Sequence, residues 1–346
     1  MIKVIGMDLG DKHNVIVPFD EDGVESPKAR IPNTSAHIQK YFAQYPGAAV
    51  VIEAGTHSAW ISRLLMTMGH KVCIGNPRKL RAIWDADDKS DERDARILGM
   101  MYRLEPRFLH PIEHRGEEAQ AALAVIKDRD QLVRTRTKLA NHVRGILKSL
   151  GVCLKDCSPE TMPARASEQT PEKFQGCVSS SLETLAFLNE RIKSRDKEIE
   201  QMCKIQFPET EWVRQISGVG PITALTFVLT LERADRFKKS RDVGPYVGLV
   251  PRRDQSGETD KQLRITKAGN TMLRRLLVSS AQYILGRFGQ DCDLRRYGER
   301  IAARGGKRAK KCAAVAVARK LAVLMHRLWA GRLKYDPLFK SIPKAA

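Results

Sequence analysis

An apolar repeat in the middle of the chain limits what the chain can fold into. From about residue 115 to residue 151 apolar side chains recur every seven residues, and a second such stretch ends before Pro208. This spacing lines one face of a long helix. A polar, proline-containing segment separates the stretches, so we expect helices over 116–151 and 178–206, paired as an antiparallel coiled-coil hairpin. An ordinary helical bundle fits the same spacing. The repeat positions are Val125, Leu132, Leu139 and Ile146, then Leu185, Ile192 and Ile199.

This hairpin divides the 346 residues into three parts, and a chain of this length exceeds one ordinary core. We place the parts at 1–112, 113–207 and 208–346. The first part alternates strand-like and helix-like segments, which predicts an α/β fold with a mixed sheet. The third part has a mostly helical pattern. The expected strands lie near 2–8, 13–19, 48–53 and 71–75, with a helix near 57–69.

The net charge of +20 is concentrated near the C-terminus, where residues 251–346 carry 23 Lys and Arg against 7 Asp and Glu. Such a positive field favours a polyanion, and nucleic acid is the usual one. An anionic membrane is the rival, but we find neither a signal peptide nor an apolar run of membrane-spanning length. The seven cysteines are scattered without metal-ligand spacing, which indicates a reducing cytosol rather than structural zinc.

Four acidic residues occupy positions that could converge at one sheet edge. Asp8 and Glu53 each end an apolar, strand-like run, and Asp91 and Asp94 stand three residues apart at the start of a predicted helix. Taken singly, a turn aspartate or a helix dipole explains each of them. Taken together, four carboxylates without histidine suit Mg²⁺, and two such ions can clamp the oxygens of a phosphoryl transfer.

Two motifs in the third part point to DNA. In "SGVGPITA", Gly218 and Gly220 form a turn before a helix whose first amides could bind a phosphate, although a purely structural cap has the same pattern. In "PRRDQSGETD", we expect Ser256 in a loop before Gly257, among arginines that would neutralise a scissile phosphate; a plain turn is the alternative. Tyr246 is a rival nucleophile, but its apolar surroundings indicate core. The basic residues expected to contact nucleic acid are Arg252, Arg253, Arg264, Lys267, Arg274, Arg275, Lys307, Arg308, Lys310 and Lys311.

The segments "GMDLGDKH", "IEAGTHS" and "DERDAR", in this order, resemble those of the RuvC-like, ribonuclease-H-fold domain of insertion sequence 110 family transposases and the related Piv-type DNA invertases. The resemblance continues through "QISGVGPITA", "YVGLVPRRDQSG" and "RITKAGNTMLRR", which match three further blocks of that family in the same order. At Thr266 the family more often has serine, which leaves the role of this position open.

The resemblance implies a site-specific DNA recombinase of an insertion sequence. Asp8, Glu53, Asp91 and Asp94 would hold Mg²⁺, and Ser256 would form a phosphoserine link to DNA in a site assembled from different subunits of a dimer or tetramer. It further implies an element-encoded bridge RNA that pairs with donor and target DNA, and a place in the bacterial cytoplasm with the nucleoid. Two other functions remain open: a structure-selective, Mg²⁺-dependent nuclease of the junction-resolvase type, and a non-catalytic nucleic-acid scaffold.

Overall fold

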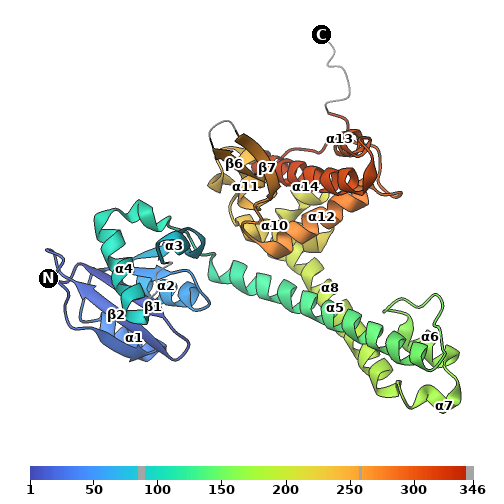
Figure 1. Cartoon of the computed structure of the whole chain (residues 1–346), viewed down its shortest axis with the longest axis horizontal. Coiled ribbons are helices and arrows are strands. Elements are labelled where there is room, and N and C mark those ends of the chain that lie inside the picture. The colour runs from blue at the N-terminus through green and yellow to red at the C-terminus, as the bar shows by residue number, and fades with distance from the viewer. Residues whose placement is uncertain (85–89, 257–258, 340–346) are drawn as a thin grey trace, which may run out of the picture. The chain divides into compact units, whose positions relative to one another are not determined.

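The computed structural model describes residues 1–84, 90–256 and 259–339. The chain divides into two compact units, Met1–Arg115 and Gly116–Ala346, which are described separately below (Figure 1). Gly257, expected after the serine in the turn, lies outside the described residues.

The first unit is built on a five-stranded mixed sheet with the strand order β3-β2-β1-β4-β5. β1 pairs antiparallel with β2 and parallel with β4, so the predicted mixed sheet is confirmed. The β-branched and apolar runs that predicted strands form its buried centre, because alternate side chains face opposite layers. The strands are β1 (Val4–Leu9), β2 (His13–Phe19), β3 (Ala29–Pro32), β4 (Ala49–Glu53) and β5 (Lys71–Gly75).

Helices cover both faces of this sheet. The helices are α1 (Ser35–Phe42), α2 (Ser58–Thr67), α3 (Pro77–Trp84) and α4 (Asp91–Leu104). Ile5 and Met7 of β1 pack with Ile38 of α1 and Ile61 of α2 on one face. On the opposite face, side chains of β1, β2 and β4 pack on Ala95, Leu98 and Met101 of α4. Neighbouring residues of β1 therefore belong to two different cores. The residues of β1 that face α4 lie on the same face as Asp8.

The second unit begins with two long helices, α5 (Glu117–Ser149) and α8 (Ser179–Ile205), which lie side by side and form an arm (Figure 1). Their contacts show that they run antiparallel: Arg129 near the start of α5 pairs with Asp196, and Arg136, farther along α5, bonds to Asn189. The expected pair of helices is thus present, while a coiled-coil supercoil stays a prediction. Two short helices, α6 (Met162–Gln169) and α7 (Glu172–Gln175), lie in the connection.

The buried face of α5 matches the predicted repeat only in part: Val125, Leu139 and Ile146 pack against its buried clusters without being fully buried themselves. The repeat residues Val125, Leu132, Leu139 and Ile146 are only half-buried. The most buried side chains include small ones, because alanine lets two helices approach closely. They are Ala119, Ala122, Leu123, Ile126, Ala140, Val143 and Leu147. A stripe of larger apolar side chains thus remains partly exposed along α5.

The rest of the second unit is a helical domain with one exposed hairpin. Its core is α10, which is buried from Thr223 onward and packs with Trp329 of α14 and Leu277 of α12. In the part of the chain that the structure describes, no helix is long and apolar enough to cross a membrane. The elements are α9 (Thr210–Arg214), α10 (Pro221–Leu231), α11 (Val243–Tyr246), β6 (Pro251–Ser256), β7 (Thr259–Ile265), α12 (Thr271–Leu285), α13 (Asp293–Ala302) and α14 (Gly306–Gly331).

Candidate functional site

Two of the predicted carboxylates lie at the ends of neighbouring parallel strands. β1 and β4 pair up to Met7 and Ile52, and the next residues are Asp8 and Glu53. Paired residues of adjacent strands point to the same face of a sheet, so both acids share the face covered by α4. Both side chains are half-buried.

A glycine brings the other two carboxylates over this face. Gly6 lies directly under α4, where an added Cβ would come within 1.9 Å of the Ala95 carbonyl oxygen. Only a residue without a side chain allows this approach. Ser90 caps the helix, since its hydroxyl accepts the Arg93 amide hydrogen, so the chain enters α4 with Asp91 and Asp94 in its first turn. Asp91 lies about one turn before Ala95 and Asp94 directly precedes it, so both acids lie toward the strand end that carries Asp8.

The electrostatics show that the four acids converge. The pKa of Asp8 is raised from 3.8 to about 6, first by burial and then by the negative charges of Asp91, Asp94 and Glu53. A carboxylate responds in this way only to charges close by. Among the described residues, no three acidic, histidine or cysteine side chains already stand in the arrangement of a metal site. The four carboxylates are thus near one another but do not form a complete metal site in the described part of the chain.

Sequence reasoning missed a histidine at the same end of the sheet. The His57 Nε2 lies 3.1 Å from a carboxylate oxygen of Asp11, and the Trp60 indole donates to His57 Nδ1 over 3.2 Å. Because the indole can only donate, Nδ1 is an acceptor, and the neutral ring carries its proton on Nε2 toward Asp11. Asp11 and His57 follow Asp8 and Glu53 by three and four residues, and this position just past two strand ends is the signal that could have revealed them.

Ser256 does not lie in a loop, as the sequence suggested, but is the last residue of β6, opposite Thr259. All residues of β6 are exposed, so the strand has no apolar alternation that would predict it. Ser256 is therefore exposed at the end of the described part of β6. Beside it, Arg253 forms a two-pronged ion pair with Asp260 across the hairpin, with the shorter distance 2.7 Å.

Three residues fix the base of this hairpin. Gly248 and Gly269 both have positive φ, and an added Cβ on either would meet a backbone oxygen, of Ala268 at 2.4 Å or of Tyr246 at 2.2 Å. The Arg274 side chain is buried, and its guanidinium donates to the carbonyl oxygens of Val247 and Ala268. Arg274 thus holds the two ends of the hairpin together. This buried position does not fit the contact with nucleic acid that we expected.

The rival tyrosine is held inside the domain. The Tyr246 hydroxyl donates to the Thr230 carbonyl oxygen over 3.3 Å, and the Arg236 guanidinium lies 5.2 Å from the ring centroid. The hydroxyl hydrogen is therefore engaged in the core of the helical domain. This arrangement agrees with the expectation that Tyr246 is a core residue.

The remaining predicted contacts lie in several places. Gly218 has a φ of 91°, and Gly220 precedes the first residue of α10, so the expected glycine turn before a helix is confirmed. Arg275 forms an ion pair with Asp130 of α5, and Lys267 has a φ of 54° in the loop after β7. The exposed basic residues are Arg252 and Arg264 on the hairpin and Lys307, Arg308, Lys310 and Lys311 on the first turns of α14.

Comparisons with known proteins decide the family. A family model described as "Transposase IS116/IS110/IS902 family" matches residues 210–318, and a DEDD model of the IS110 type, described as "Transposase", matches residues 5–151. A putative transposase y4pF/y4sB of Sinorhizobium fredii is 30% identical over 81% of this chain and 72% of its own length. The chain belongs to the IS110/IS116 family of transposases. It is therefore a transposase of the insertion-sequence type, an enzyme that cuts and transfers DNA strands.

Other relatives of this transposase extend the match over most of the chain. The transposase for insertion sequence element IS1111A of Coxiella burnetii is 27% identical over 82% of this chain and 78% of its own length. A probable family 20 transposase of Pseudomonas aeruginosa is 27% identical over 96% of this chain and 98% of its own length. The matched region 5–151 contains the four carboxylates, and the matched region 210–318 contains β6 with Ser256.

Proposed function

We propose that this transposase cuts and rejoins DNA through a phosphoserine intermediate at Ser256, with Mg²⁺ held by Asp8, Glu53, Asp91 and Asp94. The observation that carries the proposal is geometric: Asp8 and Glu53 end neighbouring parallel strands on the face that α4 covers, and the first turn of α4 carries Asp91 and Asp94. The raised pKa of Asp8 agrees with this arrangement. An ionised cluster of this kind is unstable without a cation, and carboxylate oxygens are the ligands that Mg²⁺ prefers. Bound Mg²⁺ would supply charge stabilisation for phosphoryl transfer.

Two groups of residues have separate roles in this proposal, the four carboxylates and the serine. Asp8 and Glu53 fix two oxygen ligands on the rigid strand ends, and Asp91 and Asp94 add two from the first turn of α4. Ser256 is exposed at the end of β6, where its hydroxyl can meet a DNA phosphate. In the first step the serine oxygen bonds to phosphorus, the bond to one sugar oxygen breaks, and that oxygen takes the proton. In the second step a sugar hydroxyl of another strand displaces the serine.

The serine route explains strand rejoining without an energy source. Transfer of the phosphoryl group to serine keeps a phosphodiester-type bond, whereas attack by water would end in hydrolysed DNA. Two structural features support Ser256 over Tyr246: the tyrosine hydroxyl is bonded to a carbonyl in the core, and the serine stands on an exposed ribbon. A basic side chain, Arg252, shares the exposed strand and can offset phosphate charge.

We also propose that the protein acts as a homo-oligomer and uses an element-encoded guide RNA, as the resemblance implies. The half-buried apolar stripe on α5 is available for contact between copies. The excess of basic residues after residue 251 supports binding to RNA as well as DNA. Sequencing of co-purified nucleic acid with and without RNase treatment would test the RNA, and its absence would contradict that part of the proposal.

The main experiment uses a supercoiled plasmid that carries the element junction, with Mg²⁺. We expect joined recombinants from the unaltered protein, and none from Asp8→Asn or Ser256→Ala, while both variants still bind DNA. Gln255→Ala, a change on the neighbouring exposed residue of β6, serves as the matched control and should recombine normally. Mass spectrometry of the trapped adduct should find the nucleotide on Ser256. A nucleotide on Tyr246, or full recombination by Ser256→Ala, would overturn the assignment.

A further inference from the structure

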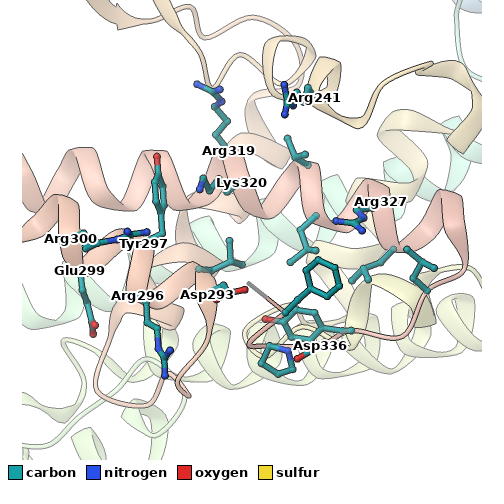
Figure 2. Close-up of a pocket in the computed structure, with 18 of the residues that line it drawn as sticks. Arg241, Asp293, Arg296, Tyr297, Glu299, Arg300, Arg319, Lys320, Arg327 and Asp336 are labelled. Carbon is teal, nitrogen blue, oxygen red and sulfur yellow. The ribbon is translucent and has the colours of Figure 1, made fainter. Parts of the chain in front are cut away.

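A large groove lies on the helical domain, away from the hairpin. It is bordered by α13, α14, the segment from Leu333 to Phe339 and the side chain of Arg241 (Figure 2). Its volume is about 1170 Å³. This exceeds the usual volume of about 300–1,000 Å³ for a small-molecule pocket. The size therefore favours part of a chain molecule over a single small ligand.

The floor of the groove is apolar and aromatic. Leu294 of α13 and Val323 of α14 contribute aliphatic surface, and Tyr297, Tyr335 and Phe339 contribute rings. Phe339 is 48% exposed, so part of its ring is accessible at the edge of the groove. An occupant must therefore offer an apolar, flat surface to part of the groove.

The walls of the groove are strongly basic. Seven lysine and arginine side chains line it against three acidic ones. Within the described part of the chain, Arg241, Arg300 and Arg319 form no ion pair, so their charges are not offset inside the protein. Two further cations lie over rings of the floor: Lys320 Nζ is 3.5 Å from the Tyr297 centroid, and the Arg327 guanidinium is 5.3 Å from the Phe339 centroid.

We propose that this groove binds a single-stranded segment of nucleic acid. Unpaired bases have flat apolar faces that stack on aromatic rings, and their phosphates need the uncompensated cations. A duplex hides its base faces, so it would leave the apolar floor uncovered. An acidic peptide would satisfy the cations but lacks the flat surfaces for the rings. The occupant is unpaired RNA or an unpaired DNA strand, which share this chemistry.

The groove shares no lining residue with the carboxylate cluster or the hairpin, and its lining lies partly inside the matched family region, with Arg241 and α13, and partly beyond it. The matched family region ends at residue 318, whereas Arg319, Lys320, Arg327 and the whole segment after α14 lie beyond it. The inference concerns binding alone and does not depend on Ser256 as the nucleophile. Its failure would leave the cleavage proposal standing, and a failure of cleavage would not affect it.

The test measures binding of fluorescent oligo(U), oligo(dT) and a mixed-sequence duplex of equal length by anisotropy. Phe339→Ala should weaken binding of at least one single strand about 5- to 150-fold, the loss expected for one stacked base, and leave the duplex nearly unchanged. The control is Phe187→Ala on the arm, which also removes an exposed phenylalanine with an arginine, Arg191, over its ring. That control should bind all three probes normally.

A second pair of variants tests the charges. The double variant Arg300→Ala with Arg319→Ala should reduce the steepness of the plot of log binding constant against log salt concentration for single strands. The slope should change by roughly 1.4, about 0.7 for each phosphate that is no longer neutralised. The matched control, Lys193→Ala with Lys197→Ala, removes two exposed charges from α8 and should not change it. Weaker binding of oligo(U) alone identifies RNA, and weaker binding of oligo(dT) alone identifies DNA. Three results would overturn the proposal. The first is unchanged single-strand binding by both groove variants, and the second is an equal loss of duplex binding. The third is a bound fluorescent probe that polyglutamate displaces but unlabelled oligonucleotides do not.

Discussion

Replacing Gly6 with alanine should disable the carboxylate cluster without touching any of its acids. The added Cβ would lie 1.9 Å from the Ala95 carbonyl oxygen and 2.9 Å from the Gly99 amide nitrogen, whereas ordinary contact begins near 3.4 Å. Both neighbours are backbone atoms of α4, so no side chain can rotate away. The helix and the strand must therefore separate by about 1.5 Å at this point.

This displacement has two expected effects. Overpacking of a buried contact costs about 1–3 kcal/mol of folding free energy. In addition, Asp91 and Asp94 move away from Asp8 and Glu53 by a distance comparable to a Mg²⁺–oxygen bond of about 2.1 Å. A misplacement of about 1 Å in a catalytic site can cost about 100-fold in rate. We therefore expect Gly6→Ala to lose at least that factor in strand cleavage while remaining folded.

The assay combines urea unfolding, followed by circular dichroism, with cleavage of the junction plasmid and DNA binding in a gel. Gly55→Ala is the matched control, because it adds the same methyl group two residues after Glu53, where nothing lies within 4 Å. It should cleave normally. If folded Gly6→Ala protein cleaved DNA at the unaltered rate, then the close approach of α4 to β1 would not position the acids, and the reasoning would fail.

Three further predictions follow from other parts of the structure. The pKa of Asp8 is about 6 in the folded chain, against an ordinary value of 3.8, so the folded chain binds this proton more tightly than the unfolded chain does. The resulting contribution to folding stability is fully present below about pH 4 and is lost as the pH rises through 6. Asp8→Asn in EDTA should therefore raise the stability at pH 8, by about 1–2 kcal/mol after allowance for solvent screening, and should abolish stabilisation by Mg²⁺; thermal unfolding that is the same for both proteins would contradict this. Arg274→Met should leave two carbonyl oxygens unpaired at the hairpin base and cost about 1–3 kcal/mol, and urea unfolding at unaltered stability would show that Arg274 does not fix the hairpin. Leu139→Glu on the half-buried stripe of α5 should lower the mass measured by sedimentation without loss of helix signal; a monomer before and after the change would argue against assembly through this stripe.

Local patterns predicted the elements that carry the four acids. The β-branched runs that end in Asp8 and Glu53 lie in β1 and β4, as expected, and Ser90 caps a helix that opens with Asp91. These patterns predict that the acids could converge at one sheet edge, but they do not reveal the close approach of α4 to β1. That approach depends on the contact of Gly6 with α4, which joins residues about ninety positions apart and is determined by packing.

Elements with weak apolar signals were missed. The short β3 and α1 were not expected, and the sequence predicts a loop at Ser256 because every residue of β6 is exposed. Period-two alternation reports one buried face, and a ribbon without a buried face has none. On α5, the seven-residue repeat of large side chains lies beside the fully buried positions, which include Ala140.

The antiparallel pairing of α5 and α8 allows the length of the arm to differ between relatives of this protein. Both ends of the arm join the same helical domain, since Ala122 of α5 and Cys203 of α8 pack with Leu225 of α10 in one cluster. Equal numbers of turns can therefore be added to or removed from α5 and α8 without moving the domain's own elements. With a rise of about 1.5 Å per residue, the 33 residues of α5 span about 50 Å. The length of the arm can thus change between relatives, or be changed by design, in steps of one helical turn.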